Sequence, residues 1–392
     1  MNKYDFDTVI DRRNSGSMKW DVKEGELPMW VADMDFPTAP EIREALKKRV
    51  EHGVFGYSIV PEEWYEAICS FWKRRHHFEM KQEWLLFCTG VIPAISSIVR
   101  KLTTPAEQVV VLTPVYNIFF NSIYNNGRNI LECLLVYEKG SYHIDFVALE
   151  EMLSQNQTTM LLLCNPHNPI GHIWERDILK RIGELAGKYH VVVVSDEIHC
   201  DLTAPGQEYT PYASVSETCR NNSISLIAPT KAFNLAGLQT SAIVVPNPVL
   251  RHKVNRGINT DEVAEPNAFA ITAAVAAFNE GEAWLDALRE YVERNKQAVA
   301  DFIEDELPML TLLPSNATYL LWLDCGGLTT DSEALAKFIR KETGLFITGG
   351  SVYRGNGNQF LRMNVACARS VLEDGLKRLK TGVEAFCNSV CR

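Results

Sequence analysis

Three side chains suited to chemistry follow short apolar runs in the middle of the sequence. They are Asn168 after the run 160–164, Asp196 after the run 191–194 and Lys231 after the run 223–227. Such runs are typical of buried parallel strands, and α/β proteins bind ligands at the carboxyl ends of those strands. An aspartate there carries a large desolvation cost, whereas a lysine there can form a Schiff base with a carbonyl group.

Each of these residues, taken alone, also fits an ordinary structural role. Asp196 could cap a helix or form a structural ion pair, and Lys231 could lie at the surface with its stem packed on apolar neighbours. Asn-Pro dipeptides surround Asn168, which is typical of a turn. Taken together, the three match the needs of pyridoxal phosphate, which bonds a lysine, pairs its ring nitrogen with an acid and requires an anchored phosphate.

Other parts of the sequence could complete such a site. Asn168 could form a hydrogen bond with the phenolic oxygen of the ring. Tyr116, which follows the apolar run 109–112, could stack on the ring face. A helix is predicted to begin after Gly90, and free backbone N–H groups at a helix start suit a phosphate.

The pattern around these residues predicts an α/β fold. Apolar runs alternate with amphipathic stretches such as 175–189, whose apolar side chains fall on one helical face. Unbroken apolar strands are typical of a mainly parallel sheet that helices cover on both faces. We expect strands at 109–112, 131–136, 160–164, 191–194, 223–227 and 242–245.

The pattern changes near residue 265, which indicates a second, smaller α+β domain. A long helix is expected over 282–307, followed by short strands and helices. We expect the strands at 319–323, 345–348 and 360–364, and the helices at 332–341 and 370–386. Near the N-terminus, residues 38–52 are expected to form a helix with Thr38 as its cap and Gly53 at its end.

Composition argues against several classes of protein. The 39 Lys and Arg against 49 Asp and Glu give a net charge of −10 without a long basic run, so we expect no nucleic-acid partner. No apolar stretch approaches the roughly 18 residues of a membrane span, and we expect no secretory signal. The ten cysteines form no Cys-x-x-Cys pair, so we expect reduced thiols, no metal site and a cytoplasmic location.

Seven strings along the chain, taken in order, are more specific than any single residue. They are Trp-Val-Ala-Asp-Met-Asp-Phe at 30–36, Phe-Gly-Tyr at 55–57, Thr-Pro-Val-Tyr-Asn at 113–117, Cys-Asn-Pro-His-Asn-Pro at 164–169, Ser-Asp-Glu-Ile-His at 195–199, Lys-Ala-Phe-Asn-Leu-Ala-Gly-Leu-Gln at 231–239 and Phe-Leu-Arg-Met-Asn at 360–364. This order resembles fold-type-I pyridoxal-phosphate enzymes, the aminotransferase class I/II group. Within that group the chain is most similar to the PatB/MalY-like cystathionine β-lyase, or C–S lyase, subfamily.

The resemblance implies a role for several residues and assigns catalysis to Lys231, Asp196 and Tyr116. The residues expected to bind the cofactor are Lys231 (Schiff base), Asp196 (ring nitrogen), Tyr116 (ring face), Asn168 and His199 (phenolic oxygen), and Val91, Ile92, Thr230 and Tyr57 (phosphate). The substrate carboxylate is expected to bind between Arg362, in a two-pronged pair, and the backbone near Ala32. Tyr57 is expected to reach the site of the other subunit, which implies a homodimer with shared active sites.

The resemblance also implies a fold with defined domains. Residues 49–275 are expected to form the large cofactor-binding domain around a mainly parallel seven-stranded sheet, and 276–392 a small C-terminal α+β domain. Residues 1–48 are expected to join the small domain. The sequence departs from the family pattern at four positions: Ala228 replaces a phosphate-binding Ser or Thr, Gln239 and His172 replace arginines, and Ile118 replaces a proline. These departures bear on cofactor affinity and on leaving-group preference.

The activity that the resemblance implies is α,β-elimination from a small sulfur amino acid. Cystathionine or a cysteine S-conjugate would yield a thiol, pyruvate and ammonia, with Lys231 removing the Cα proton. An aminotransferase on the same scaffold is the alternative, although the motifs show no second arginine for a substrate carboxylate. A third possibility is a MalY-like regulatory protein that binds a protein partner and has incidental lyase activity.

Overall fold

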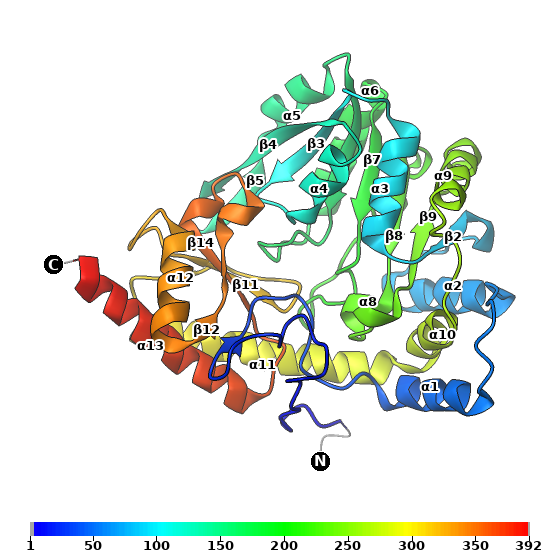
Figure 1. The fold of residues 1–392 in the computed structure, drawn as a ribbon. Coiled ribbons are helices and arrows are strands. Elements are labelled where there is room, and N and C mark those ends of the chain that lie inside the picture. Colours follow the sequence, from blue (N-terminus) through cyan, green and yellow to red (C-terminus); the bar gives the residue numbers. More distant parts are fainter. Residues whose placement is uncertain (1–3, 391–392) are drawn as a thin grey trace.

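The apolar runs of the sequence form the centre of an eight-stranded sheet in the computed structural model, which describes residues 4–390 (Figure 1). In spatial order the strands are β2 (Leu85–Cys88), β9 (Ser241–Val244), β8 (Ser223–Ile227), β7 (Val192–Asp196), β6 (Thr158–Cys164), β3 (Gln108–Thr113), β4 (Asn129–Glu138) and β5 (Ser141–Ile144). Each predicted strand of this region is present, with bounds that differ from the prediction by a few residues.

The sheet is mainly parallel, as predicted, but it has one strand more than the seven expected. The strands β4, β3, β6, β7 and β8 pair in parallel, whereas β5, β9 and β2 are antiparallel to their neighbours. Neither β2 nor β5 was among the strands expected from the sequence, and β5 folds back on β4 through Lys139 and Gly140. Both residues have positive φ angles, 50° and 79°, as the tight hairpin turn requires.

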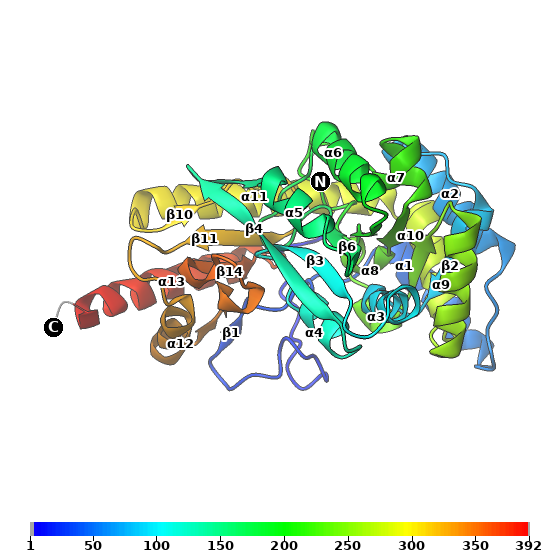
Figure 2. The same ribbon diagram turned by 90° about the horizontal axis from the view of Figure 1, so that it is seen from above.

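Helices cover both faces of this sheet, so that its central strands are buried (Figure 2). One face carries α3 (Val91–Leu102), α4 (Ile118–Tyr124) and α9 (Pro248–Thr260), and the other carries α5 (Phe146–Leu153), α6 (Arg176–Lys188) and α7 (Glu217–Asn221). Two separate hydrophobic clusters fill the spaces between the sheet and its helices. This arrangement confirms the doubly covered α/β sheet that the sequence predicts.

The C-terminal third of the chain forms a smaller layer around an antiparallel sheet. That sheet contains, in order, β10 (Thr311–Leu312), β11 (Leu320–Asp324), β14 (Phe360–Asn364) and β13 (Thr348–Gly349). The helices beside it are α11 (Glu282–Glu306), α12 (Ser332–Thr343) and α13 (Arg369–Val390). The single strand predicted at 345–348 is two short strands in the structure. β13 belongs to this sheet, whereas β12 (Leu345–Phe346) pairs with β1 (Leu27–Pro28) of the N-terminal segment.

The remaining helices lie below the large sheet in the view of Figure 1. They are α1 (Pro40–His52), α2 (Glu62–His76), α8 (Pro229–Ala232) and α10 (Ala270–Glu280). Gly53 ends α1 with a φ of 73°, as predicted, but the prediction that Thr38 caps the helix is wrong. Ala39 occupies the cap position and Pro40 the first turn, where the missing N–H of proline would have had no helical partner.

The described residues also bear on the predictions about membranes and cysteines. Between residues 4 and 390, no helix is long and apolar enough to cross a membrane. The nine cysteines in this range are all free thiols, as the sequence predicts.

Candidate active site

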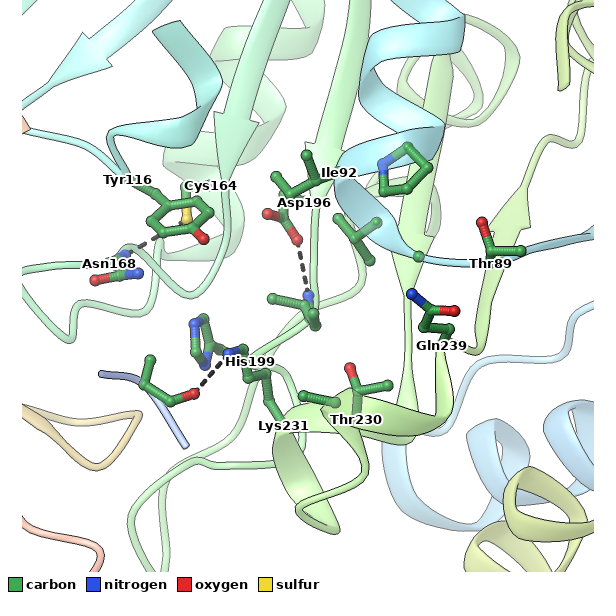
Figure 3. A pocket seen from close by; sticks show the side chains of 16 residues that line it. Thr89, Ile92, Tyr116, Cys164, Asn168, Asp196, His199, Thr230, Lys231 and Gln239 are labelled. Carbon is green, nitrogen blue, oxygen red and sulfur yellow. Dashed lines mark hydrogen bonds between the residues drawn. The ribbon is translucent and has the colours of Figure 1, made fainter. Parts of the chain in front are cut away.

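A cavity of about 280 Å³ lies at the carboxyl ends of β6, β7 and β8 (Figure 3). The predicted site residues that line it are Ala32, Val91, Ile92, Tyr116, Asn168, Asp196, His199, Thr230 and Lys231. Its other lining residues are Thr89, Gly90, Pro93, Cys164, Ile198, Ala236 and Gln239. The fold therefore brings together residues as far apart in the sequence as Ala32 and Gln239.

Asp196 is the last residue of β7, and its carboxylate is buried in this cavity. Its side chain is fully buried and accepts a hydrogen bond of 3.1 Å from the backbone N–H of Ile198. Burial, and secondarily the neighbouring charge of Glu197, raise the pKa of Asp196 to about 7. A buried carboxylate of this kind is stabilised by a cation. The structure describes no ion pair to Asp196, so a cationic ligand group would find an unmatched charge there.

Lys231 lies on the short helix α8, opposite Asp196 across the cavity (Figure 3). Its Nζ donates a hydrogen bond of 2.6 Å to the carbonyl oxygen of Ala32. Burial lowers the pKa of Lys231 to about 8, and the positive charge of Arg362 acts in the same direction. A lysine amine with a lowered pKa is a better nucleophile and a better base near neutral pH.

The helix α3 begins at the cavity without a side-chain cap. Gly90 holds the cap position, where it has no side chain that could bond the first N–H groups. The backbone N–H groups of Val91 and Ile92 are therefore available to an anion, as helix N-termini commonly are. Thr89, Thr230 and Gln239 line the same end of the cavity and add neutral polar groups.

Tyr116, Asn168 and His199 lie at the opposite side of the cavity from Gln239 (Figure 3). Burial raises the pKa of Tyr116 to about 12 and lowers the pKa of His199 to about 3. Both side chains are therefore neutral at physiological pH. The Nδ1 atom of His199 is buried without a hydrogen-bond partner among the described residues. Such an atom can bond a polar group of a ligand.

Arg362, on β14, does not line the cavity but contacts a residue that does. Its Nη1 donates to Oδ1 of Asn168 at 3.2 Å, and its Nη2 donates to the carbonyl oxygen of Trp30 at 2.8 Å. The guanidinium is buried over the ring of Tyr353, and its Nε has no partner within the described chain. Arg362 thus keeps an unused donor beside the cavity.

Tyr57 is the one predicted site residue that lies away from the cavity. It belongs to an extended segment between α1 and α2, and its side chain is fully exposed at 103%. The apolar residues Val54 and Ile59 of the same segment are also exposed.

The structure adds residues that sequence reasoning missed. Tyr319 donates its hydroxyl to the carbonyl oxygen of Ala32 at 3.0 Å, so it shares an acceptor with Lys231. Cys164 accepts a hydrogen bond from the backbone N–H of Asn168 at 3.4 Å. Tyr319 begins an apolar stretch that reads as an ordinary strand, so no sequence signal marked it. Cys164 belongs to the string 164–169. Its position at the end of the predicted strand 160–164 was a sequence signal that could have identified it.

The departures noted in the sequence fall at different distances from the cavity. Gln239 lines it, and Ala228 precedes α8 as the residue at its cap position. His172 does not line it and packs instead edge-on against Trp174. A second group of titratable residues consists of His76, Cys200 and Asp201, of which His76 and Cys200 line another cavity. Arg75 lies 3.6 Å from the Asp201 carboxylate.

Comparison with known proteins assigns the chain to a family. The family model for aminotransferase class I and II matches residues 27–379. The chain belongs to this family. The aminotransferase class I and II chain is 40% identical to cystathionine beta-lyase PatB of Bacillus subtilis (strain 168), over 96% of this chain and 99% of the relative. It is 33% identical to protein MalY of Escherichia coli (strain K12), over 97% and 99% respectively.

Among solved structures, this family member is similar to cystalysin from Treponema denticola, whose crystal structure contains a pyridoxal 5'-phosphate cofactor. The two match with a TM-score of 0.95 and 34% sequence identity, over 98% of this chain and 99% of that chain. The family and subfamily resemblance inferred from the motifs is therefore confirmed.

Proposed function

We propose that this protein is a pyridoxal-phosphate-dependent carbon–sulfur lyase of the cystathionine β-lyase type. It would convert cystathionine or a cysteine S-conjugate to a thiol, pyruvate and ammonia by α,β-elimination. When bound, pyridoxal 5'-phosphate acts as an electron sink for the electron pair left on Cα. The observation that carries the proposal is the meeting of Lys231, Asp196 and the start of α3 in one cavity. The names of relatives such as PatB support the same reaction.

The cavity fits this cofactor in charge and in hydrogen-bonding groups. Asp196 would pair with the protonated ring nitrogen, which supplies the cation that the buried carboxylate needs. Asn168 and the unpartnered Nδ1 of His199 would hold the phenolic oxygen, and Tyr116 would pack on the ring face. The uncapped start of α3 and the hydroxyl of Thr230 would bind the phosphate.

Lys231 would bond the cofactor and, once displaced by the substrate amine, take the Cα proton on its Nζ. The carbonyl oxygen of Ala32 holds that amine within the cavity. With its pKa lowered to about 8, Lys231 is in part unprotonated near neutral pH and can act as a base. One nitrogen thus serves for both attachment and proton transfer.

Arg362 would bind the substrate α-carboxylate, with the backbone near Ala32 on the other side. Its guanidinium is buried and already oriented by Trp30 and Asn168, so little rotamer entropy remains to be lost on binding. The unpartnered Nε offers a further donor for a carboxylate oxygen. A bidentate pair of this kind fixes the direction of the Cα–H bond as well as the affinity.

The exposed segment around Tyr57 supports a homodimer with shared active sites. Lys231 is the only lysine or arginine among the described residues that line the cavity, so the phosphate has few strong side-chain donors in one chain. We propose that the partner's Tyr57 supplies one. Arg49 fixes the segment by donating to the carbonyl oxygen of Val54 at 2.7 Å, and the exposed Val54, Phe55 and Ile59 would be buried in the interface.

Two further proposals concern the organisation and location of the chain. The division into residues 1–48, 49–275 and 276–392 is our proposal for its domains, with the eight-stranded sheet in the second and the four-stranded sheet in the third. The free thiols of the described cysteines are consistent with a cytoplasmic enzyme. A regulatory protein partner, considered from the sequence, stays a prediction.

An aminotransferase is the second candidate function, because the matching family carries that name. It would share the removal of the Cα proton by Lys231 but would require a keto acid as second substrate. No arginine is among the described residues that line the cavity, and Arg362 contacts it only through Asn168. This arrangement provides for one substrate carboxylate and argues against transfer between dicarboxylates.

Product analysis of the purified holoenzyme distinguishes the two functions. Incubated with L-cystathionine and no keto acid, the lyase is expected to release pyruvate, ammonia and homocysteine in equal amounts. Added keto acid should not raise the rate. Amino transfer that occurs only with a keto acid, and without pyruvate from cystathionine, would overturn the proposed function in favour of the aminotransferase.

A further inference from the structure

An irregular stretch of the N-terminal segment, residues 30–36, crosses the active site and is called the strap here. It lies outside any helix or strand, yet its carbonyl oxygens hold the side chains proposed to act on the substrate. Trp30 accepts from Arg362 at 2.8 Å, and Ala32 accepts from Lys231 at 2.6 Å. The positions of these two side chains therefore depend on the position of the strap.

A cluster of charged side chains holds the strap from the side of the N-terminus. Arg12 forms two hydrogen bonds with the carboxylate of Asp33, at 2.9 and 3.2 Å, and one with Asp35 at 2.7 Å. It also donates to the carbonyl oxygen of Met34 at 2.9 Å. The buried Lys19 balances the second carboxylate, with its Nζ 2.8 Å from Asp35. Two cations thus match two anions.

Arg12 contacts three consecutive strap residues directly after Ala32, and it does not line the cavity. We propose that Arg12 is a positioning residue for the elimination reaction. It fixes the strap so that the backbone around Ala32 and the guanidinium of Arg362 form the two sides of the carboxylate site. This inference rests on the proposed function, because it assigns substrate binding to Arg362.

The strap needs side chains to fix its position because it contains no regular secondary structure. A strand or helix would fix these carbonyl groups through its own ladder of hydrogen bonds, whereas the strap depends mainly on side chains from elsewhere. Arg12 supplies a planar fork that matches the Asp33 carboxylate in two hydrogen bonds, a geometry that lysine does not provide. Misplacement of substrate-orienting groups by about 1 Å can cost about 100-fold in rate.

A double-mutant cycle in the holoenzyme tests the inference, with pyruvate release from L-cystathionine as the assay. Arg12→Ala is expected to lower kcat/KM by about 10- to 100-fold, mainly through a higher KM, while the visible absorbance of the bound cofactor is retained. In the Arg362→Ala background the same substitution should cost several-fold less, because the group that it positions is already gone. Arg12→Lys should recover part of the loss.

The matched control is Arg340→Ala. Arg340 forms a similar two-bond pair with Glu26, at 2.7 and 2.8 Å, and tethers the same N-terminal segment outside the strap. Its removal is expected to leave kcat/KM within about threefold of wild type. If Arg12→Ala does not fold, Arg12→Lys is carried through the same cycle.

The outcomes separate the inference from the proposed function. A wild-type protein that releases no pyruvate would overturn the proposed function itself. With an active wild type, equal fold losses from the Arg12 substitution in both backgrounds would overturn the positioning role. An equal loss from Arg340→Ala would also overturn it, since any tether of the segment would then serve.

Discussion

The amine of Lys231 lies 2.6 Å from the carbonyl oxygen of Ala32, although the two residues are 199 positions apart in the sequence. The hydroxyl of Tyr319 donates to the same oxygen at 3.0 Å. The N-terminal segment, helix α8 and the residue that precedes β11 therefore meet at one atom. The active site therefore depends on contacts between distant parts of the chain.

Asp196→Asn is expected to lower kcat by about 10²- to 10³-fold without loss of the fold. The amide has the size of the carboxylate but does not keep a ring nitrogen protonated. The measurement is steady-state pyruvate release, with circular dichroism to verify folding. An Asp196→Asn enzyme with the wild-type kcat would contradict the proposed role of the carboxylate.

The same substitution should change stability in a pH-dependent way. The pKa of Asp196 is raised to about 7 in the folded chain from its usual 3.8, so the folded state binds more protons between those values. The contribution of Asp196 to stability is therefore lost as the pH rises through 7. Without cofactor, Asp196→Asn should melt above the wild type at pH 8, and the difference should shrink towards pH 5. A difference that grows on acidification has the wrong sign.

Arg362→Ala should retain the visible absorbance of the bound cofactor while kcat/KM for cystathionine falls. A loss on the order of 2–5 kcal/mol in transition-state binding is expected if a buried charge pair is broken, and Arg362→Lys should recover only part of it. An amine substrate that lacks the α-carboxylate provides the control and should lose much less. Equal losses on both substrates would indicate that Arg362 has a structural role only.

The pH profile of kcat should rise through the region near pH 8, where the Lys231 ammonium loses its proton. His199 and Tyr116 do not account for this rise, because their pKa values lie near 3 and 12. The charge of Arg362 lowers the pKa of Lys231, so Arg362→Gln should move the rise to higher pH. A rise that stays in place, or moves to lower pH, would argue against Lys231 as the base.

The shared-site dimer predicts complementation between two inactive variants. In a mixed dimer of Tyr57→Ala and Lys231→Ala chains, one site contains both native residues and the other contains neither. Equal mixing and reassembly should therefore restore about a quarter of the wild-type activity. Mixed dimers with no more activity than the parent variants would show that Tyr57 acts within its own chain or not at all.

Much of the site was predictable because its residues stand at strand ends. Asp196 closes an unbroken apolar run, and Lys231 follows another, so the parallel sheet places both at one edge. The strand β5 was missed because it is short and alternates exposed and buried residues, unlike the central strands, and the equally short β2 was missed too. Thr38 failed as a cap because the chain enters α1 through Pro40, whose own geometry fixes the start of the helix.

Other features depend on tertiary contacts that no local pattern reports. Tyr319 acts through a hydroxyl at the start of a strand, and Arg12 lies among residues that read as a polar N-terminal segment. The position of Arg362 behind Asn168 likewise follows from the packing of β14 against the strap. Such contacts can be recognised only in the folded structure, which gives the positions of both residues.

The most direct test of the proposed lyase mechanism is to identify the lysine to which the cofactor is attached. Lys231 and Lys296 are both buried lysines with a pKa lowered to about 8, but only Lys231 lies in the cavity. Borohydride reduction of the holoenzyme, followed by peptide mass spectrometry, should place the cofactor mass on the peptide that contains Lys231. Lys231→Ala should lose that label and nearly all pyruvate release, while Lys296→Ala keeps both. A label on Lys296 or elsewhere, or an active Lys231→Ala enzyme, would rule out Lys231 as the residue that binds the cofactor and removes the proton.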